Sequence, residues 1–128
     1  MSKPEITLRV PGEKAYALVL RLALGGVAIL KDLDAGTLDD LRVASDEACD
    51  CLLHQGRDVK MVELSVHDAD KSLTISLEAE FCGEKTDDCS DATSISRAVL
   101  ETLIPEVELV QLPCGCIKRI DLTLPKAV

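Results

Sequence analysis

Residues 37–56 read TLDDLRVASDEACDCLLHQG, and their apolar positions repeat at the spacing of one helix face. The charged residues lie off this stripe, so the pattern predicts an amphipathic helix. Thr37 is expected to cap its N-terminus, with Asp40 completing a capping box. Gly56 is expected to end the helix in the left-handed conformation. The apolar stripe consists of Leu38, Leu41, Ala44, Ala48, Cys51 and Leu52.

This helix resembles the N-box helix of the GHKL (Bergerat-type) ATPase fold, and especially that of the anti-sigma-factor serine kinases, which control sporulation and stress sigma factors. Their helix typically reads D-L-x-x-A-x-S-E-A-x-x-N-A-x-x-H. The resemblance implies that Glu47 stands at the general-base position and that Cys51 replaces the asparagine that holds magnesium. A neutral thiol is a poor ligand for this hard cation. An ordinary amphipathic helix would show the same stripe without such roles. The residues in step with the motif are Asp40, Leu41, Ala44, Glu47, Ala48 and His54.

The elements around this helix follow the order of that family. Residues 6–10 alternate as a short strand, and residues 13–30 read as a helix that is apolar nearly all round. So many apolar positions predict two buried sides for that helix. The later elements are a hairpin over 62–66 and 73–81, a helix over 94–104 that Pro105 stops, and strands over 107–112 and 117–124.

The order β-α-α-β-β-α-β-β predicts a single α+β domain over residues 1–128. We expect a two-layer sandwich, with a mixed, mostly antiparallel sheet and the helices on one face, as in the GHKL and histidine-kinase ATPases. A chain of 128 residues has the usual size of one domain. Because 47% of the residues are hydrophobic but only 2% aromatic, the core must consist of Leu, Val, Ile and Ala.

The charge and the cysteines indicate where such a protein works. A net charge of −9 argues against nucleic acid as a partner, because phosphate contacts need Lys and Arg. No signal peptide is visible, and the apolar run 15–30 is interrupted by Arg21 and shorter than the ~20 residues that span a membrane. We therefore expect a cytoplasmic protein whose six cysteines stay reduced.

The remaining nucleotide motifs of the family are altered here. In the family, a D-x-G-x-G motif follows the second hairpin strand, and the resemblance places Ala79 at its aspartate and Phe81 at its first glycine. Moving the register by one would offer Glu78 or Glu80 but would turn the apolar side of the strand outward. Serines stand at both glycines of the lid motif, which corresponds to residues 94–97, and the loop over 84–91 is acidic and would repel ATP. We expect no cofactor, and the substituted nucleotide positions are Cys51, Ala79, Phe81, Ser94 and Ser96.

Two C-x-C pairs raise the question of metal binding. Cys49 and Cys51 point about 200° apart on a helix, so they are unsuited to share one ion. Cys51 lies on the apolar stripe and is expected to be a small core residue. Cys114 and Cys116 flank Gly115 in a turn, where either a metal site or a redox pair is open. We predict no metal site.

Two functional classes remain open. The first is an anti-sigma-factor-like regulatory protein that binds a sigma factor or a STAS-type (anti-anti-sigma) antagonist without ATP chemistry. The second is an ATP-dependent serine kinase that works with ATP and magnesium through unusual ligands. The resemblance and the apolar helix 13–30 also predict a homodimer. Candidate partner-binding residues are Arg21, Asp39, Arg42 and Asp46.

Overall fold

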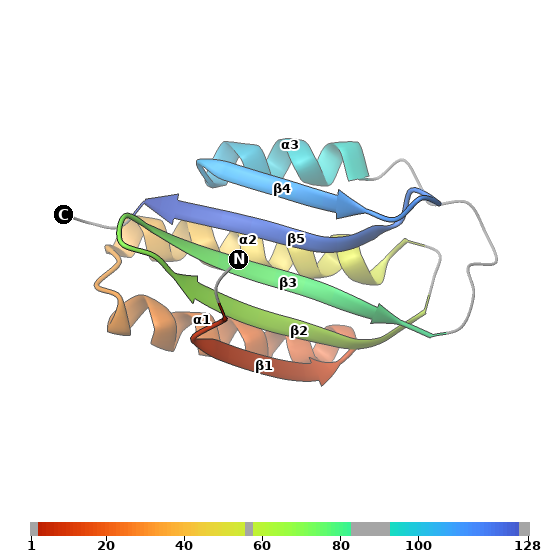
Figure 1. The fold of residues 1–128 in the computed structure, drawn as a ribbon, viewed down its shortest axis with the longest axis horizontal. Helices are drawn as coiled ribbons and strands as arrows, with labels where there is room; N and C mark the ends of the chain where they lie inside the picture. The colour runs from red at the N-terminus through yellow and green to blue at the C-terminus, as the bar shows by residue number, and fades with distance from the viewer. Residues whose placement is uncertain (1–2, 56–57, 83–92, 126–128) are drawn as a thin grey trace.

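The alternating segments of the sequence pair in one antiparallel sheet with the strand order β1-β2-β3-β5-β4 (Figure 1). This computed structural model describes residues 3–55, 58–82 and 93–125. The predicted strands are all present, and the helices lie within a few residues of their expected bounds. The elements are β1 (Ile6–Pro11), η1 (Lys14–Tyr16), α1 (Ala17–Leu30), α2 (Ala35–Leu53), β2 (Val59–Asp68), β3 (Ser72–Phe81), α3 (Thr93–Leu103), β4 (Glu106–Gln111) and β5 (Ile117–Pro125).

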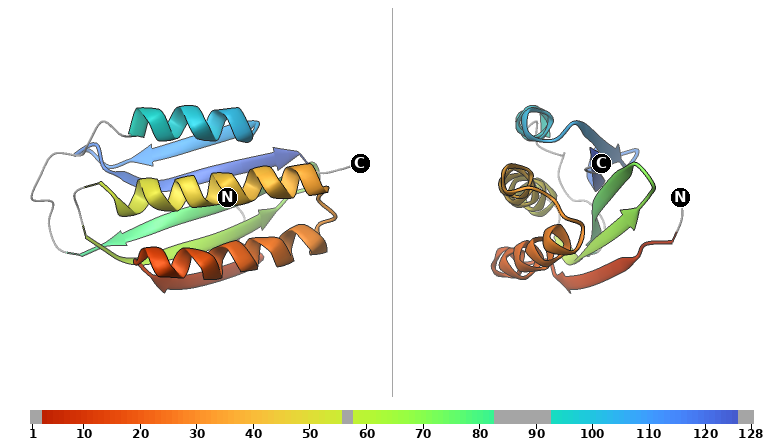
Figure 2. Two further views of the ribbon diagram at one scale, coloured as in Figure 1. Left: turned by 180° about the vertical axis from the view of Figure 1, so that it is seen from behind. Right: turned by 90° about the vertical axis from the view of Figure 1, so that its left-hand side faces the viewer.

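The three α-helices cover one face of this sheet, which gives the two layers of an α+β sandwich (Figure 2). α2 lies in the middle of the helix layer, between α1 and α3. The other face of the sheet carries the polar residues of each strand. The predicted fold class is therefore confirmed.

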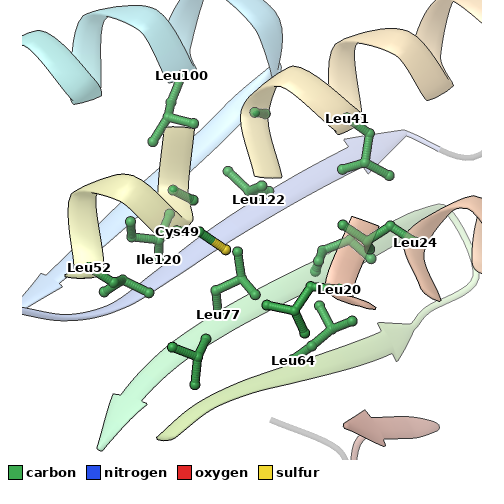
Figure 3. Packing of buried hydrophobic residues seen from close by; sticks show 14 of the residues in the cluster. Leu20, Leu24, Leu41, Cys49, Leu52, Leu64, Leu77, Leu100, Ile120 and Leu122 are labelled. Atoms are coloured by element: carbon green, nitrogen blue, oxygen red, sulfur yellow. The ribbon is translucent and has the colours of Figure 1, made fainter. Parts of the chain in front are cut away.

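The core between the layers is aliphatic, as the scarcity of aromatic residues predicted. Leu73, Ile75, Leu77 and Ala79 alternate along β3 and are fully buried, so the strand register expected from the sequence is confirmed. Figure 3 shows leucines from α1, α2 and α3 meeting this sheet face, with Cys49 pointing from α2 toward Leu77. Burial, and to a smaller extent the charges of the nearby carboxylates Asp46 and Asp50, raise the pKa of the Cys49 thiol to about 12.

The N-cap of α2 lies three residues earlier than the sequence predicted. Asp34 is the N-cap, and its Oδ1 accepts a hydrogen bond from the backbone N–H of Thr37 at 2.7 Å. This bond holds the pKa of Asp34 below its ordinary value. The predicted capping box of Thr37 and Asp40 is wrong, because Thr37 supplies a backbone donor instead of a capping hydroxyl. Gly56 lies outside the described residues.

Helix α1 buries only one of its sides within a single chain. Leu20, Leu24, Val27 and Ala28 face the sheet. On the opposite side, five apolar residues are between 42% and 76% exposed; they are Leu18, Val19, Leu22, Ile29 and Leu30. In the described ranges, no helix is long and apolar enough to cross a membrane.

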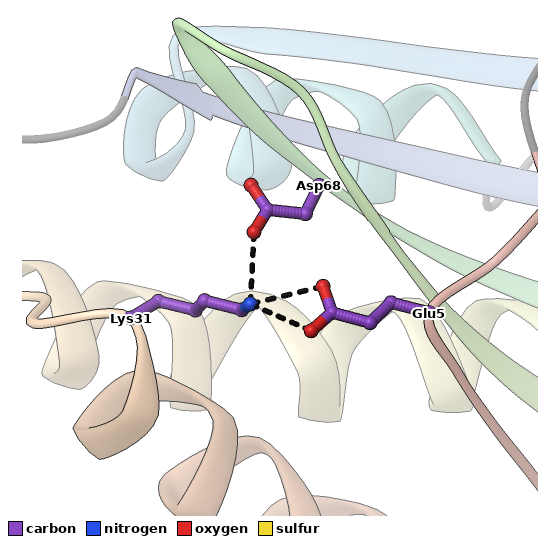
Figure 4. A network of polar contacts seen from close by, with 3 residues as sticks. All are labelled: Glu5, Lys31 and Asp68. Atoms are coloured by element: carbon purple, nitrogen blue, oxygen red, sulfur yellow. Dashed lines mark hydrogen bonds and ion pairs between the residues drawn. The ribbon is translucent and has the colours of Figure 1, made fainter.

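One ion cluster fastens the C-terminal end of α1 to the sheet (Figure 4). The Lys31 ammonium lies 2.8 Å from Asp68 Oδ2, at the end of β2, and 2.9 Å from both carboxylate oxygens of Glu5, just before β1. These hydrogen bonds, that of Asp68 first, raise the pKa of Lys31. The cluster joins three segments that are distant in the sequence.

Candidate functional site

The α2–α3 cluster, which consists of Glu47, Cys51 and Ser96, brings together three of the predicted nucleotide-site residues. Glu47 and Cys51 lie four residues apart on α2, so they share one helix face. Ser96, on α3, is 7% exposed, and its hydroxyl donates a hydrogen bond to Glu47 Oε1 at 2.9 Å. The carboxylate at the general-base position is therefore tied to α3.

Cys51 completes this cluster as a buried, neutral thiol. It is 7% exposed. Burial raises the pKa of Cys51, the hydrogen bond with Ser96 works in the opposite direction, and the charge of Glu47 raises it again. A protonated thiol offers a hard cation no oxygen ligand. The chemistry of the donor set thus does not fit magnesium.

Ala79 and Phe81 lie near the end of β3, where the family binds adenine. Ala79 is fully buried, and its backbone carbonyl accepts a hydrogen bond from Lys118 Nζ. The same ammonium lies 5.7 Å from the centre of the Phe81 ring, within the range of a cation–π contact. The methyl side chain of Ala79 cannot accept a hydrogen bond from an adenine amino group.

The two glutamates that flank Ala79 point to the other side of the sheet. Glu78 lies 3.9 Å from Arg119 and Glu80 lies 3.0 Å from Arg9. Neither glutamate can therefore replace the missing aspartate of the D-x-G-x-G motif without a change of register.

The lid region is only partly described. Ser94 lies in α3, but its side chain and the acidic loop 84–91 lie outside the described residues. Arg97, which follows Ser96, faces Glu101 one turn later, with 3.9 Å between guanidinium and carboxylate. Of the two lid serines, Ser96 is therefore the one whose side-chain contact the structure describes.

The four candidate partner-binding residues form two ion pairs on the helix layer. Arg21 Nη2 of α1 lies 2.6 Å from Asp46 Oδ2 of α2. Asp39 and Arg42, on the exposed side of α2, are 4.0 Å apart. These four residues are therefore separate from the α2–α3 cluster, because Glu47 faces α3 whereas Asp46 faces α1.

The Arg21–Asp46 pair lies in a groove between the start of α1 and the C-terminal half of α2. The groove has a volume of about 340 Å³, and its walls also include Lys14, Leu18 and Asp50. The sequence pattern did not identify these three residues as parts of a site. The helical period could have indicated that Leu18 is exposed, since it lies opposite the buried stripe of α1. The approach of Lys14 to Asp50 could not be predicted, because it depends on how the helices pack.

A further residue that the sequence did not reveal is Gln55, just after α2. It is 2% exposed, and its amide nitrogen donates to the carbonyls of Ile117 at 2.8 Å and Leu52 at 3.2 Å. Its amide oxygen accepts from the N–H of Ile117. Gln55 thus pairs with β5 as a neighbouring strand would.

The turn between β4 and β5 differs from the expectation for its cysteines. Cys116 is buried and disulfide-bonded, so the prediction that all six cysteines are reduced is wrong for this residue. Cys114 is exposed. Across the described part of the chain, His, Cys, Asp and Glu side chains form no group of three or more that could hold a metal ion.

Comparison with known proteins gives a likeness in structure. No protein-family model and no curated protein matches this chain. The solved structure of the RsbU and RsbW domains of Rv1364c from Mycobacterium tuberculosis matches with a TM-score of 0.69 at 15% sequence identity. The match covers 98% of this chain and 34% of that one, so this chain spans about a third of its length. At this identity the likeness concerns the backbone alone, and it shows that the chain shares the fold of part of that structure.

Proposed function

We propose that this chain is an anti-sigma-factor-like regulatory protein, which binds a sigma factor or a STAS-type antagonist without ATP chemistry. The likeness to a structure that contains an RsbW domain supports the regulatory class. One observation supports the absence of ATP chemistry: the hydroxyl of Ser96 donates a hydrogen bond to Oε1 of Glu47 and ties this carboxylate to α3, beside the neutral thiol of Cys51. A general base needs its carboxylate available to the attacking hydroxyl.

Titration calorimetry with ATP and Mg²⁺ tests this absence directly. We expect no binding in the low micromolar range, which would correspond to about −8 kcal/mol. Restoring the family residue with Cys51→Asn is expected to leave binding weak, because Ala79 still lacks the acceptor for adenine. Low-micromolar binding by the wild-type protein would overturn the proposal.

The ATP-dependent serine kinase remains the second candidate, because the fold does bring Glu47, Cys51 and Ser96 together. A kinase assay on the purified partner separates the two functions. If ATP labels a serine of the partner and Glu47→Ala abolishes the label, the protein is a kinase. If the partner binds and stays unlabelled, the binding function stands alone.

The partner assay uses any sigma factor or STAS protein encoded near the gene, each purified and passed over the immobilised chain. Retention of one of them at moderate salt is the expected result, with binding that weakens as salt rises because the chain carries a charge of −9. Loss of all retention at every salt concentration would remove the binding function. The proposed contact residues are Arg21, Asp39, Arg42 and Asp46, whose side chains are 39% to 74% exposed.

We place this function in the cytoplasm, where a sigma factor acts. The disulfide of Cys116 argues against a strongly reducing compartment. Alkylation of intact cells before lysis, followed by mass spectrometry, measures the state of Cys116. If Cys116 is reduced inside the cell, the result agrees with a cytoplasmic location. If it is fully oxidised there, the result contradicts that location.

A further inference from the structure

The surface formed by α1 and α2 has an apolar part and an acidic part side by side. α1 supplies the apolar part, because Arg21 is the only charged residue among its fourteen positions. Leu18 and Leu22 are 56% and 69% exposed. Since a helix turns by about 100° per residue, Leu18 lies about 60° from Arg21, the residue that faces α2. Leu18 accordingly forms part of the groove wall.

α2 supplies the acidic part. Its sequence contains five carboxylates and one arginine, a net charge of −4. Asp46 is engaged by Arg21, and Asp39 lies near Arg42. Asp50 follows Asp46 by one helical turn in the groove wall, and among the described residues its side chain has no ion pair or hydrogen bond. Lys14 lines the same groove, but among the described residues it forms no ion pair with Asp50. Asp46 and Asp50, four residues apart, repel each other, so a further cation brought to Asp50 relieves that repulsion.

We propose that this α1–α2 surface docks a basic, amphipathic helical segment of the protein partner. Apolar residues of the segment cover Leu18 and Leu22, and a Lys or Arg side chain enters the groove and pairs with Asp50. The inference rests on the proposed function and specifies the chemistry of the partner segment. A helix fits because two neighbouring helices present a groove into which the side-chain ridges of a third helix pack.

A second copy of this chain fits the same surface poorly. It would bring another net charge of −9, and Arg21, the only cation of its α1, is already paired with Asp46. Its α1 would therefore offer Asp50 no unpaired cation. A basic segment supplies both the apolar cover and the missing charge.

Substitutions in the purified complex test the surface. Leu18→Glu is expected to weaken binding of the retained sigma factor or STAS protein at least about tenfold, since a carboxylate would replace a buried apolar contact. Asp50→Asn is expected to weaken it less and to lower its salt dependence. The matched controls are Ile95→Glu, at a 68% exposed apolar position of α3, and Asp40→Asn, on another side of α2. Both controls should bind as the wild type does.

A synthetic 18-residue helical peptide of Leu and Lys, in which Leu recurs every three or four positions, tests the surface without the natural partner. We expect binding that Leu18→Glu abolishes, and no binding of the corresponding Leu and Glu peptide. A scrambled Leu and Lys peptide that binds equally well would show plain charge attraction and overturn the proposal.

The outcomes distinguish a failure of the docking surface from a failure of the proposed function. If a partner is retained but Leu18→Glu and Asp50→Asn bind it normally, the docking surface is wrong and the proposed function stands. If no partner is retained, the proposed function fails and the peptide titration decides the surface by itself. If Leu18→Glu converts a wild-type dimer to a monomer, a second copy covers this surface and the proposal is overturned. Thermal unfolding of each variant confirms that it is folded.

Discussion

Among the described glycines, Gly12 is the one at which the backbone leaves least room for a side chain. It follows β1, and its N–H donates to the carbonyl of Lys60 at 2.9 Å. A Cβ at this position would lie 2.2 Å from the carbonyl oxygen of Val59, so any side chain must push the start of β2 away. The sequence alone does not reveal this close approach.

Gly12→Ala is therefore expected to destabilise the protein by about 2 kcal/mol, the usual cost of overpacking. Gly26→Ala is the matched control, because its Cβ meets nothing within 4 Å and alanine favours a helix by about 0.5–1 kcal/mol. Urea unfolding measures both. Equal losses in the two variants would show that close approach to Val59 is not the cause.

The buried amide of Gln55 is a second case at this scale. Gln55→Leu keeps the size of the side chain but leaves the N–H and the carbonyl of Ile117 without their partner. Because each buried, unpaired polar group costs about 1–3 kcal/mol, we expect a loss of roughly 2–4 kcal/mol in the free energy of unfolding.

Gln111→Leu serves as the control for Gln55→Leu. The amide of Gln111 also bonds a backbone carbonyl, that of Gly115 at 3.3 Å, but it is exposed. Its loss is expected to change stability by no more than about 0.5 kcal/mol. A small effect of Gln55→Leu in urea unfolding would mean that water replaces the missing partner.

At the scale of elements, Lys31 holds the end of α1 to β2 and to the residue before β1. Its pKa is raised above its ordinary value of 10.5, so its contribution to stability is complete below that value. The contribution is lost as pH rises through the higher pKa of the folded state. The free energy that separates Lys31→Met from the wild type should therefore shrink above about pH 10.5.

Urea unfolding at pH 7 and pH 11 measures this difference. Lys71→Met, in the exposed hairpin turn, is the control and should differ little from the wild type at either pH. A difference for Lys31→Met that stays constant or grows toward pH 11 would exclude the ion cluster as its source.

At the scale of the whole molecule, the elements that the sequence predicted best are those with a clear period. The alternation along β3 fixed its register, since a slip of one residue would expose Leu73, Ile75 and Leu77. The cap of α2 was misplaced because both Asp34 and Thr37 are good capping residues, and only the chain path selects between them.

Contacts in the candidate site could be predicted from the sequence where both residues lie on one helix. Contacts between residues of separate elements could not. Glu47 and Cys51 follow from their spacing on α2, whereas the bond from Ser96 depends on how α3 packs against it. The groove at Arg21 and Asp46 likewise depends on the packing of α1 against α2. Pairs of residues that are distant in sequence and polar in character carry no periodic signal.

The homodimer is a proposal at this largest scale. Val19 and Leu30 are 42% and 73% exposed and lie about 160° and 180° around α1 from Arg21, on the side away from α2. Exposed apolar patches of this kind usually mark an interface, and this side remains available when a partner helix occupies Leu18.

Light scattering behind a sizing column, at tens of micromolar protein, is expected to give twice the chain mass of 13.8 kDa. Val19→Glu should shift the protein to the monomer, because two carboxylates would face each other across a two-fold axis. Ile95→Glu, on α3, should remain dimeric. A wild-type monomer at this concentration would contradict the dimer. Dissociation by Ile95→Glu but not by Val19→Glu would move the interface from α1 to α3.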